Sequence, residues 1–390
     1  MIPRVLAKKL LQSAKKFPVV AVTGPRQSGK TTLVRRLFAQ KPYVSLEDLD
    51  TRDFAKNDPR GFLSEYSKGA VLDEIQRVPE LFSYLQTLVD EKKKAGLFIL
   101  TGSSQFLLME NLSQTLAGRV HILNLLPLSL EELRVFKAKP ATAETAILRG
   151  MYPRLYDKRI AASDWYPDYL RTYIERDVRL IKNISDLSQF QKFLKLCAGR
   201  SAQLLNLSSI ADECGMKHNT AKAWIGILEA SFVVYLLKPH HRNFNKRVVK
   251  IPKLYFYDTG LACSLLEIET ERQLKTHPLK GQLFETLILG ELIKYRLNRG
   301  LPANLYFWRD KTGHEIDCVI DQAGKLIPIE VKFGKTVTQD FFRNLNYWRD
   351  ISKQKKTPAF LLYGGEQNQR RGMVSIINWQ NPDSLFAHLK

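Results

Sequence analysis

The sequence predicts an α/β protein: a parallel sheet that carries a phosphate-binding loop, followed by further helical and α/β domains. Three observations support this fold class. An apolar, β-branched run, Phe17 to Thr23, is followed by the glycine-rich stretch Gly24 to Thr32 (GPRQSGKTT) and by a helical pattern over Thr32 to Gln40. A second apolar run ends in Asp73 and Glu74. The length of 390 residues exceeds what one compact core usually holds, so several domains are expected.

The glycine-rich stretch has the residue types that a phosphate-binding loop requires. Gly24 and Gly29 allow the backbone to fold so that successive N–H groups point at phosphate oxygens, and the helix that follows adds its positive end. Lys30 supplies a charge to the β- and γ-phosphates, and the Thr31 hydroxyl is placed to ligate Mg²⁺. We therefore expect ATP and Mg²⁺ as cofactors. The predicted nucleotide-binding residues are Gly24, Pro25, Arg26, Gln27, Ser28, Gly29, Lys30, Thr31 and Thr32, with Ser103 from a later strand.

Two acids follow at the distance expected for a neighbouring strand. Gly69 to Gln76 (GAVLDEIQ) is predicted to be a strand whose carboxyl end carries Asp73 and Glu74, and ligands of open α/β sheets bind at that edge. Asp73 is expected to hold Mg²⁺ through water, and Glu74 to orient and deprotonate the attacking water. Taken alone, such a pair is more often a solvated strand end. Behind a phosphate-binding loop, the catalytic interpretation is favoured.

The next predicted strand, Leu97 to Thr101, is followed by Ser103, and Arg119 stands immediately before another apolar run. These positions resemble the AAA+ ATPases, in which a polar sensor follows the fourth core strand and an arginine finger precedes the fifth. The resemblance implies Thr101 or Ser103 as the sensor. It implies Arg119 as a catalytic finger that acts in a neighbouring subunit of a homo-oligomer. A surface arginine is the alternative for Arg119.

Composition limits the class of protein and its partners. The net charge is +21 and the sequence pI about 9.7, which favours a polyanionic partner, with nucleic acid, and DNA first, as the default. The run Lys92 to Lys94 is interpreted instead as a solvated helix end. No apolar run is long enough to predict a membrane span. The four cysteines show neither metal-ligand nor disulfide spacing, which favours a cytoplasmic protein.

Helical segments are expected before and after the sheet domain. Residues 1–16 (MIPRVLAKKLLQSAKK) have the pattern of an amphipathic helix that packs beside the sheet, with a transit peptide or a membrane-surface helix as minor alternatives. Ala143 to Ile184 is mostly helical in pattern and fits a small lid over the nucleotide. Arg171 or Arg176 would reach the phosphates from this lid, the alternative being an ion pair with a nearby carboxylate.

A short capped helix, Asn206 to Gly215, is followed after two residues by a second helical segment, His218 to Glu229. A helix, a glycine turn and a second helix with polar first residues is the helix-turn-helix arrangement. Phe232 to Leu237 and Lys253 to Tyr257 are expected to be the strands of a wing. Winged helices also serve as protein-interaction modules, but the basic loop of this wing favours DNA. The wing residues expected to bind nucleic acid are Arg242, Lys246, Arg247 and Lys250; Lys238 and Lys253 add to the charge, with His240, His241 and Phe244 interleaved.

A second acidic constellation lies towards the end of the sequence. Glu285 falls in an amphipathic helical pattern, and Asp317 falls in a predicted strand (EIDCVI). The next predicted strand, Leu326 to Phe333 (LIPIEVKF), places Glu330 and Lys332 on one face, because strand side chains alternate. An acid in one strand and Glu-x-Lys in the next are residue types that bind a metal ion and activate water.

This pattern resembles the PD-(D/E)xK nuclease superfamily, whose fold is the restriction-endonuclease-like α/β domain. The resemblance implies that Asp317 and Glu330 bind Mg²⁺. Lys332 would help to activate water, and Glu285 would complete the metal site from its helix. The sequence departs from the superfamily at Ile316, where the proline of its motif is absent. A salt bridge between Glu330 and Lys332 in a catalytically silent domain is the alternative.

Taken together, these segments resemble one family across nearly the whole chain: the bacterial and archaeal AAA-type ATPases with a C-terminal domain of unknown function 4143. The matching segments are Gly24 to Thr32, Asp73 to Gln76, Thr101 to Ser104, Leu116 to Arg119, Tyr173 to Val178 and Glu315 to Lys332. The resemblance implies an ATPase with a nuclease-like tail. We expect an AAA+ P-loop core over residues 1–135, a helical lid over 136–185, a winged helix-turn-helix over 186–258 and a nuclease-like domain over 259–390.

The sequence leaves three functions open. The favoured one is Mg²⁺-dependent ATP hydrolysis, with Glu74, Arg119 and Lys30 as catalytic residues, coupled to a nucleic-acid-associated activity. The second is an ATP-switched DNA endonuclease that uses the Asp317 constellation. The third is a nucleotide-dependent adaptor in which the nuclease fold is silent.

Overall fold

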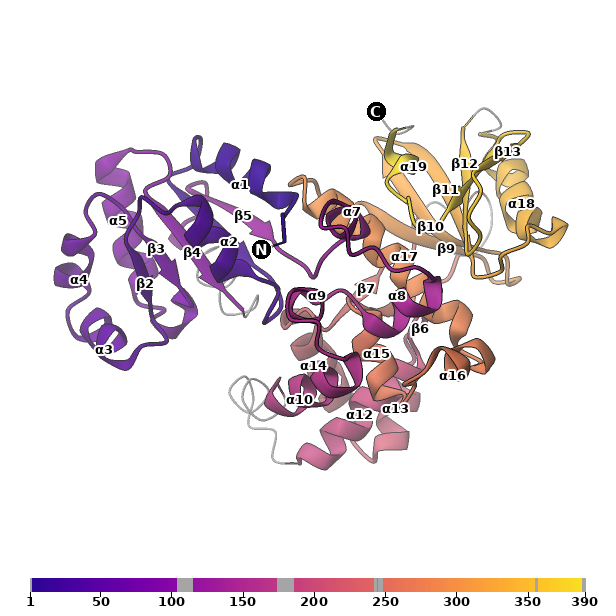
Figure 1. The fold of residues 1–390 in the computed structure, drawn as a ribbon, viewed down its shortest axis with the longest axis horizontal. Coiled ribbons are helices and arrows are strands. Elements are labelled where there is room, and N and C mark those ends of the chain that lie inside the picture. Colours follow the sequence, from indigo (N-terminus) through magenta and orange to yellow (C-terminus); the bar gives the residue numbers. More distant parts are fainter. Residues whose placement is uncertain are drawn as a thin grey trace. The chain divides into compact units, whose positions relative to one another are not determined.

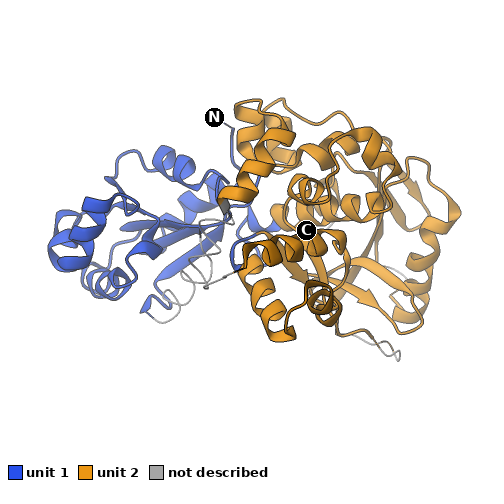
Figure 2. Cartoon of the chain, turned by 90° about the horizontal axis from the view of Figure 1, so that it is seen from below, with its two compact units in different colours: residues 1–128, 230–232, 296–302 blue, residues 129–229, 233–295, 303–390 orange. Residues whose placement is uncertain are grey.

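The computed structural model describes residues 2–103, 115–173, 186–241, 244, 248–354 and 357–387. The chain forms two compact units (Figure 2). Unit 1 contains residues 1–128, 230–232 and 296–302, and unit 2 contains residues 129–229, 233–295 and 303–390. Among the described residues, no helix is long and apolar enough to cross a membrane.

Unit 1 is built on a five-stranded parallel sheet with the order β2-β3-β4-β1-β5 (Figure 1). The strands are β1 (Val19–Thr23), β2 (Tyr43–Ser45), β3 (Val71–Asp73), β4 (Phe98–Gly102) and β5 (Val120–Asn124). Because all five run in the same direction, their carboxyl ends share one edge of the sheet, and the segments that precede them share the other. The apolar runs of the sequence thus form one parallel sheet, as expected.

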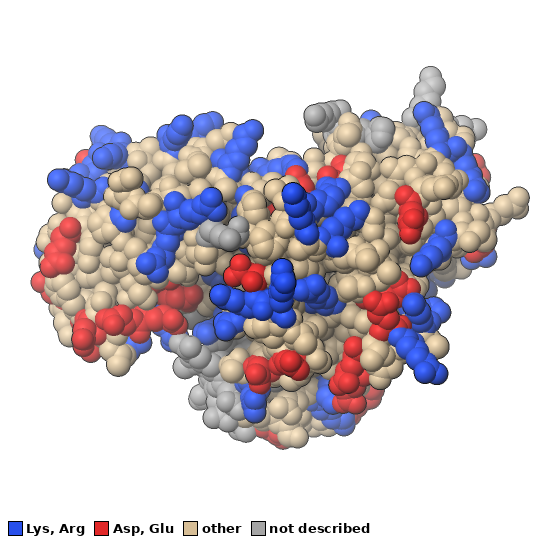
Figure 3. Space-filling model, viewed as in Figure 1, with Lys and Arg blue, Asp and Glu red and all other residues tan. Residues whose placement is uncertain are grey.

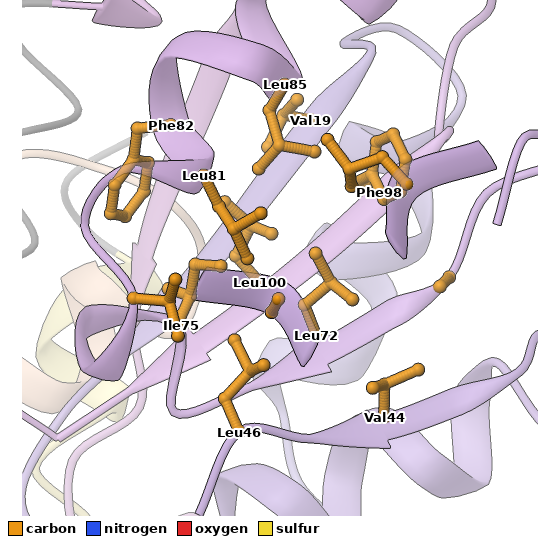
Figure 4. Packing of buried hydrophobic residues seen from close by; sticks show 14 of the residues in the cluster. Val19, Val44, Leu46, Leu72, Ile75, Leu81, Phe82, Leu85, Phe98 and Leu100 are labelled. Atoms are coloured by element: carbon orange, nitrogen blue, oxygen red, sulfur yellow. The ribbon is translucent and has the colours of Figure 1, made fainter. Parts of the chain in front are cut away.

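Helices cover both faces of this sheet. They are α1 (Leu6–Ala14) and α2 (Lys30–Leu37) on one face, and α3 (Leu49–Asn57), α4 (Pro59–Glu65) and α5 (Leu81–Lys92) on the other. Strand side chains alternate between two cores. Leu72 and Leu100 pack with Leu81 and Leu85 of α5 (Figure 4), whereas their strand neighbours face α1 and α2. The N-terminal amphipathic helix therefore packs beside the sheet, as its pattern predicts.

The strand expected to run through Gln76 ends earlier, at Asp73. Glu74 takes a left-handed backbone conformation with φ 55°, and a short 3-10 helix, η1 (Ile75–Arg77), follows. A left-handed residue turns the backbone out of the extended conformation, which ends the strand pairing. The difference matters for the site, because the side chains of the adjacent Asp73 and Glu74 then point in different directions.

Unit 2 begins with a helical region that holds a three-stranded antiparallel sheet of order β6-β8-β7. The strands are β6 (Gln203–Leu204), β7 (Val234–Leu237) and β8 (Lys253–Phe256). The helices are α7 (Leu130–Val135), α8 (Ala143–Arg149), α9 (Pro153–Asp157), α10 (Ala162–Tyr173), α12 (Leu187–Gly199), α13 (Leu207–Cys214), α14 (His218–Ala230), α15 (Thr259–Leu265) and α16 (Glu271–Thr276). Gly215 adopts a left-handed conformation after α13, so the predicted helix, glycine turn and second helix are present.

The helices expected to form a lid are hydrogen-bonded to the segment that starts α15. The buried carboxylate of Asp258 accepts a hydrogen bond from the Tyr166 hydroxyl at 2.5 Å and from the Met151 N–H at 2.7 Å. Through these two bonds the helical segment from α8 through α10 is attached to the end of the three-stranded sheet, within unit 2. The role of these helices as a lid over a nucleotide stays a prediction.

Unit 2 ends in a six-stranded mixed sheet of order β13-β14-β12-β11-β10-β9. The strands are β9 (Leu305–Arg309), β10 (Glu315–Gln322), β11 (Lys325–Lys332), β12 (Ala359–Tyr363), β13 (Gln369–Arg371) and β14 (Val374–Asn378). The flanking helices are α17 (Lys280–Leu297), η3 (Gln339–Phe342), α18 (Arg343–Ser352) and α19 (Ser384–Ala387). The core on one side of this sheet contains the fully buried Trp308 and Trp348.

The described part of the basic loop between β7 and β8 lies along β9. It forms isolated bridges to this strand region at two points, and the His240 N–H donates to the Phe307 carbonyl oxygen at 2.7 Å. The His240 side chain is 2% exposed, with its Nε2 3.1 Å from a carboxylate oxygen of Asp321. The Phe244 ring packs edge-on against Trp348. His240 and Phe244, which are interleaved with the basic residues of the expected wing, therefore pack against the C-terminal sheet.

Candidate nucleotide-hydrolysis site and a second acidic centre

The phosphate-binding loop connects β1 to α2, and two glycines determine its shape. Gly24 (φ 149°) and Gly29 (φ 92°) have backbone conformations that other residues rarely adopt. A Cβ atom at Gly24 would lie 2.1 Å from the carbonyl oxygen of Leu125, so no side chain fits there. Gly29 is the N-cap of α2 and has no side chain that could cap the first N–H groups of that helix. N–H groups at the start of a helix attract anions such as phosphate.

Lys30 is buried in this loop and is 5% exposed. Its Nζ donates to the carbonyl oxygens of Gly24 at 2.9 Å and Pro25 at 2.8 Å. The ammonium therefore lies across the inside of the loop. Phosphate oxygens, which carry charge, are stronger acceptors for an ammonium than these neutral carbonyls. The position fits a lysine that exchanges carbonyl partners for phosphate when a nucleotide binds.

Arg4 holds the same loop from the N-terminal side, a role that no sequence pattern predicted. Its Nη1 donates to the Ser28 carbonyl oxygen at 2.6 Å, and its Nη2 donates to the Leu126 carbonyl oxygen at 2.6 Å. One guanidinium thus joins the loop to the segment that follows β5. Only the three-dimensional arrangement brings these groups together, since they are far apart in sequence.

Asp73 is the centre of a hydroxyl network at the carboxyl edge of the sheet. The Thr31 hydroxyl of α2 donates to its Oδ2 at 2.9 Å, and the Thr101 hydroxyl of β4 donates to its Oδ1. The Tyr43 hydroxyl of β2 donates to Oδ2 at 2.5 Å. The structure thus brings together Thr31 and Asp73, the two residues that the sequence assigned to the metal. Both offer hard oxygen donors, the type that Mg²⁺ prefers.

Glu74 points into a different set of partners because of its left-handed backbone. Its Oε2 accepts a hydrogen bond from the Ser103 hydroxyl at 3.0 Å and another from the Gln76 side-chain amide. The Glu74 N–H donates to the Thr101 hydroxyl at 3.3 Å. Both predicted sensor residues, Thr101 and Ser103, therefore contact the predicted catalytic acids. Gln76, which the sequence placed only at the end of a matching segment, orients the carboxylate.

Tyr43 was not predicted as a site residue. Its phenol reaches the Asp73 carboxylate, and the guanidinium of Arg35 stacks over its ring at 4.5 Å from the centroid. Burial and the hydrogen bond to Asp73 raise the pKa of Tyr43, so the phenol stays a donor at neutral pH. Strand β2 is only three residues long, which is why the sequence carried little signal for it.

Arg119 lies at the opposite edge of the sheet from the phosphate-binding loop, immediately before β5. Its guanidinium makes two hydrogen bonds to the Asp90 carboxylate, Nε to Oδ1 at 2.5 Å and Nη2 to Oδ2 at 2.7 Å. The hydrogen bonds of this pair raise the pKa of Arg119 and lower that of Asp90. Arg119 therefore lies away from the nucleotide site of its own chain, which is compatible with the predicted action on a neighbouring subunit.

The second acidic centre lies in the six-stranded sheet. Lys332 on β11 places its Nζ 2.6 Å from Glu330 Oε1 and 3.9 Å from Asp317 Oδ2 on β10. Asp317 also accepts a hydrogen bond from the Val331 N–H at 2.8 Å, and Asn344 of α18 donates to Glu330 at 3.2 Å. The structure thus brings together three of the four predicted nuclease residues in one contact group.

Glu285 of α17 is connected to this centre through a lysine from β8. The Lys253 Nζ lies 3.2 Å from Glu285 Oε1 and also contacts Glu315, and the Tyr255 hydroxyl donates to Glu285 at 2.5 Å. Lys253 is 3% exposed. The expectation that Lys253 adds to the charge of a DNA-binding wing is therefore wrong, because its ammonium is buried between carboxylates.

The electrostatics of this centre are those of a buried, internally compensated charge group. Burial raises the pKa values of Glu285, Asp317 and Glu330. Burial opposes the charged form of Lys253 and Lys332, but the surrounding carboxylates raise both lysine pKa values. Each ammonium is thus held charged by the acids around it.

A metal ion fits poorly into this centre. In the part of the chain that the structure describes, no group of three or more His, Cys, Asp or Glu side chains is placed to hold a metal ion. Ammonium groups from Lys253 and Lys332 stand between the carboxylates. One observation points the other way, since the buried Glu330 Oε2 has no hydrogen-bond partner among the described residues. The Mg²⁺ site formed by Asp317, Glu330 and Glu285 stays a prediction.

Several predicted residues fall outside the described part of the chain. Arg242, Lys246 and Arg247 of the basic loop and Arg176 of the helical segment are among them. Lys250 is described and exposed. Arg171 is exposed and pairs with Asp168 at 2.6 Å, the kind of ion pair considered as its alternative.

Comparison with known proteins places the chain in a family. An uncharacterized protein of Mycobacterium tuberculosis, Rv2008c, is 30% identical over 342 residues, which cover 87% of this chain and 75% of that protein. An AAA domain matches residues 16–134, and a domain of unknown function (DUF4143) matches residues 280–381. The chain belongs to the AAA ATPase family with a DUF4143 domain. In this AAA protein a further domain of unknown function (DUF8612) matches residues 141–272.

More distant proteins share parts of the arrangement of this AAA protein. The uncharacterized protein MJ1544 of Methanocaldococcus jannaschii is 22% identical over 334 residues, which cover 77% of this chain and 72% of that protein. Among solved structures, the Walker-type ATPase paby2304 of Pyrococcus abyssi has a TM-score of 0.44 at 15% identity, covering 67% of this chain and 94% of that one. AMPPCP-bound DnaA from Aquifex aeolicus has a TM-score of 0.30 at 14% identity, covering 58% of this chain and 86% of that one. TM-scores this low carry no functional inference.

Proposed function

We propose that this AAA protein binds ATP with Mg²⁺ and hydrolyses it, and that hydrolysis is coupled to a nucleic-acid-associated activity. The observation that carries the proposal is the meeting of four residues at one sheet edge. Lys30 lies in the loop, the Thr31 hydroxyl contacts Asp73, and Glu74 follows in a separate orientation. Phosphoryl transfer needs a phosphate cradle, a metal and a positioned nucleophile, and these residues offer each of them.

The metal would be held by Thr31 and Asp73. Their oxygens are in hydrogen-bond contact, the donor set suits Mg²⁺, and few other ligands are required because Mg²⁺ keeps water and phosphate oxygens in such sites. When bound, Mg²⁺ neutralises charge on the β- and γ-phosphates. Tyr43 and Thr101 fix the orientation of the Asp73 carboxylate.

Glu74 is the proposed general base. Among the described residues only its Oε2 is hydrogen-bonded, to Ser103 and Gln76, and this leaves Oε1 for the attacking water. Oε1 takes the proton of that water as the water oxygen bonds to the γ-phosphorus and the bond from that phosphorus to the β,γ-bridging oxygen breaks, which releases ADP and inorganic phosphate. Ser103 and Thr101 connect this carboxylate and Asp73 to the end of β4, as expected of sensor residues.

Substitution of Lys30 tests the nucleotide site. Lys30→Ala removes the ammonium that lies across the loop, and ATP binding is expected to weaken at least about 100-fold, measured by titration with a fluorescent ATP analogue. Lys8→Ala, an exposed lysine of α1, is the matched control. Equal ATP affinity in the Lys30 variant and the wild type would sink the assignment of the loop.

Arg119 is proposed as a finger that completes the site of a neighbouring subunit in a homo-oligomer. Its position at the edge of the sheet opposite the loop supports this role. Mixing inactive Arg119→Ala and Lys30→Ala chains should restore part of the ATPase activity, because a mixed assembly contains intact loop and finger pairs. Absence of any complementation would argue against the finger.

The nucleic-acid association is proposed through a winged helix. The element order α12, β6, α13, α14, β7, β8 with an antiparallel β6-β8-β7 sheet supports this assignment. His218, Asn219 and Lys222 near the start of α14 are exposed, as a helix that enters a DNA groove requires. ATPase rates measured with and without single-stranded and duplex DNA and RNA test the coupling, with stimulation expected and an unchanged rate contradicting it.

A nuclease is the second candidate function. The contact of Asp317 and Glu330 with Lys332 across β10 and β11 favours it, as does the Glu330 Oε2, which has no hydrogen-bond partner in the part of the chain that the structure describes. Incubation of the protein with single-stranded, duplex and branched DNA in Mg²⁺ or Mn²⁺ tests it. Cleavage that disappears in Asp317→Ala would establish it, whereas cleavage that survives in this variant would exclude this centre. If no DNA is cleaved, we propose instead a nucleotide-dependent adaptor in which the nuclease fold is catalytically silent.

Two organisational features are proposed with this function. The first is that the chain is divided into a core, a lid, a winged helix and a nuclease-like domain. One DUF8612 match spans the lid and the winged helix together. A cytoplasmic location is proposed because the four cysteines are free and buried.

A further inference from the structure

A row of lysines crosses the edge of the unit 1 sheet where its strands begin. The five strands are parallel, so the residues that precede them lie along one edge, away from the phosphate-binding loop. Lysines precede four adjacent strands: β2, β3, β4 and β1. We name them the lysine row: Lys41, Lys68, Lys92, Lys93, Lys94, Lys15 and Lys16, in sheet order.

Backbone hydrogen bonds continue between these segments before the strands begin, so the row is built into the fold. The Val71 N–H donates to the Pro42 carbonyl oxygen at 2.8 Å, and the Gly96 N–H donates to the Phe17 carbonyl oxygen at 2.8 Å. The Lys41 Nζ donates to the Leu97 carbonyl oxygen at 3.1 Å. These three bonds hold the starts of β2 and β3, and of β4 and β1, side by side.

The lysines of the row make no ion pair with a carboxylate in the part of the chain that the structure describes. Six of the seven are exposed and Lys41 is half-buried. Burial, and then the charge of Lys94, lower the pKa of Lys41, so two members of the row interact. The acids nearest in sequence are Glu65, Asp90 and Glu91, and Arg119 already holds Asp90. Seven cations gathered without ion-pair partners among the described residues repel one another, and a polyanion offsets that repulsion.

The dimensions of the row suit a sugar-phosphate backbone. Four adjacent strands spaced about 4.8 Å apart extend over about 14 Å, which matches the axial rise of about four phosphates on one DNA strand. Lysine is a point charge without the planar fork that reads base edges, so such a contact carries no sequence preference. Figure 3 shows Lys and Arg side chains gathered over the α1 side of unit 1, and Asp and Glu along its lower left edge.

An anionic membrane surface is a poorer match for the row. Segments that bind such surfaces place large apolar side chains beside their basic residues. Of the large apolar side chains that are exposed in the described residues, two lie on helices that border the row: Leu11 on α1, which precedes Lys15, and Tyr84 on α5, which ends at Lys92. Seven lysines against two exposed apolar side chains make the row mainly a charged surface.

We propose that the lysine row binds the phosphate backbone of a nucleic acid, as a second contact of the ATPase unit that is independent of base sequence. It deepens the nucleic-acid association proposed above and rests on it. A nucleic acid held there touches the same sheet that carries Asp73 and Glu74 at its other edge. This gives hydrolysis in unit 1 a direct contact with its partner.

Charge reversal within the row tests the proposal. Lys68→Glu with Lys94→Glu changes two exposed lysines of different strands, and Lys56→Glu with Arg60→Glu makes the same charge change on α3 and α4. Fluorescence anisotropy of labelled DNA and RNA is measured over a range of salt concentrations. We expect the row variant to bind at least about tenfold more weakly, with a shallower salt dependence, and the control variant to bind like the wild type. ATP affinity unchanged in both variants shows that the fold is intact.

Four results would overturn the proposal. Equal binding and an equal salt slope in wild type and row variant would exclude the row while leaving the proposed function intact. No binding of any nucleic acid by the wild type would remove both. If the row variant loses binding to phosphatidylserine vesicles but keeps its nucleic-acid binding, the partner of the row is an anionic membrane surface. A smaller assembly mass of the row variant, by light scattering, with nucleic-acid binding retained would identify a contact between copies of the chain.

Discussion

Asp73 shows at the scale of one residue how much the surroundings of a carboxylate determine. Three hydroxyls from three elements donate to it, and two of them, from Thr31 and Thr101, come from positions that the sequence already placed in the site. The third, from Tyr43, holds Oδ2 at 2.5 Å. A carboxylate that accepts several hydrogen bonds is fixed in orientation, which a ligand of Mg²⁺ with strict octahedral geometry requires.

Removal of the Tyr43 hydroxyl should weaken the metal site and leave the fold intact. In Tyr43→Phe one of the three donors to Asp73 is lost, so we expect the Mg²⁺ concentration for half-maximal ATPase activity to rise about tenfold, the lower end for loss of an outer-shell partner. The measurement is ATPase rate against free Mg²⁺ at saturating ATP. The control is Tyr84→Phe, which changes an exposed tyrosine of α5. An unchanged Mg²⁺ dependence, or a loss of rate that no Mg²⁺ concentration restores, would contradict this positioning role.

At the scale of elements, the loop between β1 and α2 is constrained by its contact with the segment after β5. Gly24→Ala would place a methyl group 2.1 Å from the Leu125 carbonyl oxygen at a φ of 149°. We expect at least tenfold weaker ATP binding and a loss of about 1–3 kcal/mol of stability, because the loop must shift. Isothermal titration and thermal denaturation measure the two effects. Gly226→Ala, where a Cβ meets nothing, should leave both unchanged; equal behaviour of the two variants would refute the steric argument.

The buried lysine of β8 is a second element-scale feature. Lys253 joins the three-stranded sheet to α17 and β10 through Glu285 and Glu315. Lys253→Met leaves buried carboxylates without their cation, so we expect the free energy of unfolding to fall by about 3–5 kcal/mol. Urea denaturation followed by tryptophan fluorescence measures it, with the exposed Lys250→Met as the control. If Lys253→Met proves as stable as the control, the compensated charge group is not what holds these elements together.

At the scale of the whole molecule, local pattern predicted most of unit 1 and the order of elements in unit 2. The phosphate-binding loop, Asp73 and Glu74 were predicted because glycine spacing and a strand end are local signals. Tyr43, Arg4 and Lys253 were missed or misplaced because their roles depend on partners far away in sequence. Lys253 shows the limit most clearly, since a lysine in a basic run has the same local pattern whether it is buried or exposed.

The central claim is that Glu74 at the end of β3 is the base of an ATPase. The most direct test compares ATP binding and steady-state hydrolysis in the wild type and in Glu74→Gln, which keeps the size of the side chain and removes its basicity. The account predicts ATP affinity within about twofold of wild type and turnover at least about 100-fold lower. Normal turnover in Glu74→Gln, or no ATP hydrolysis by the wild type in Mg²⁺ with or without nucleic acid, would contradict it.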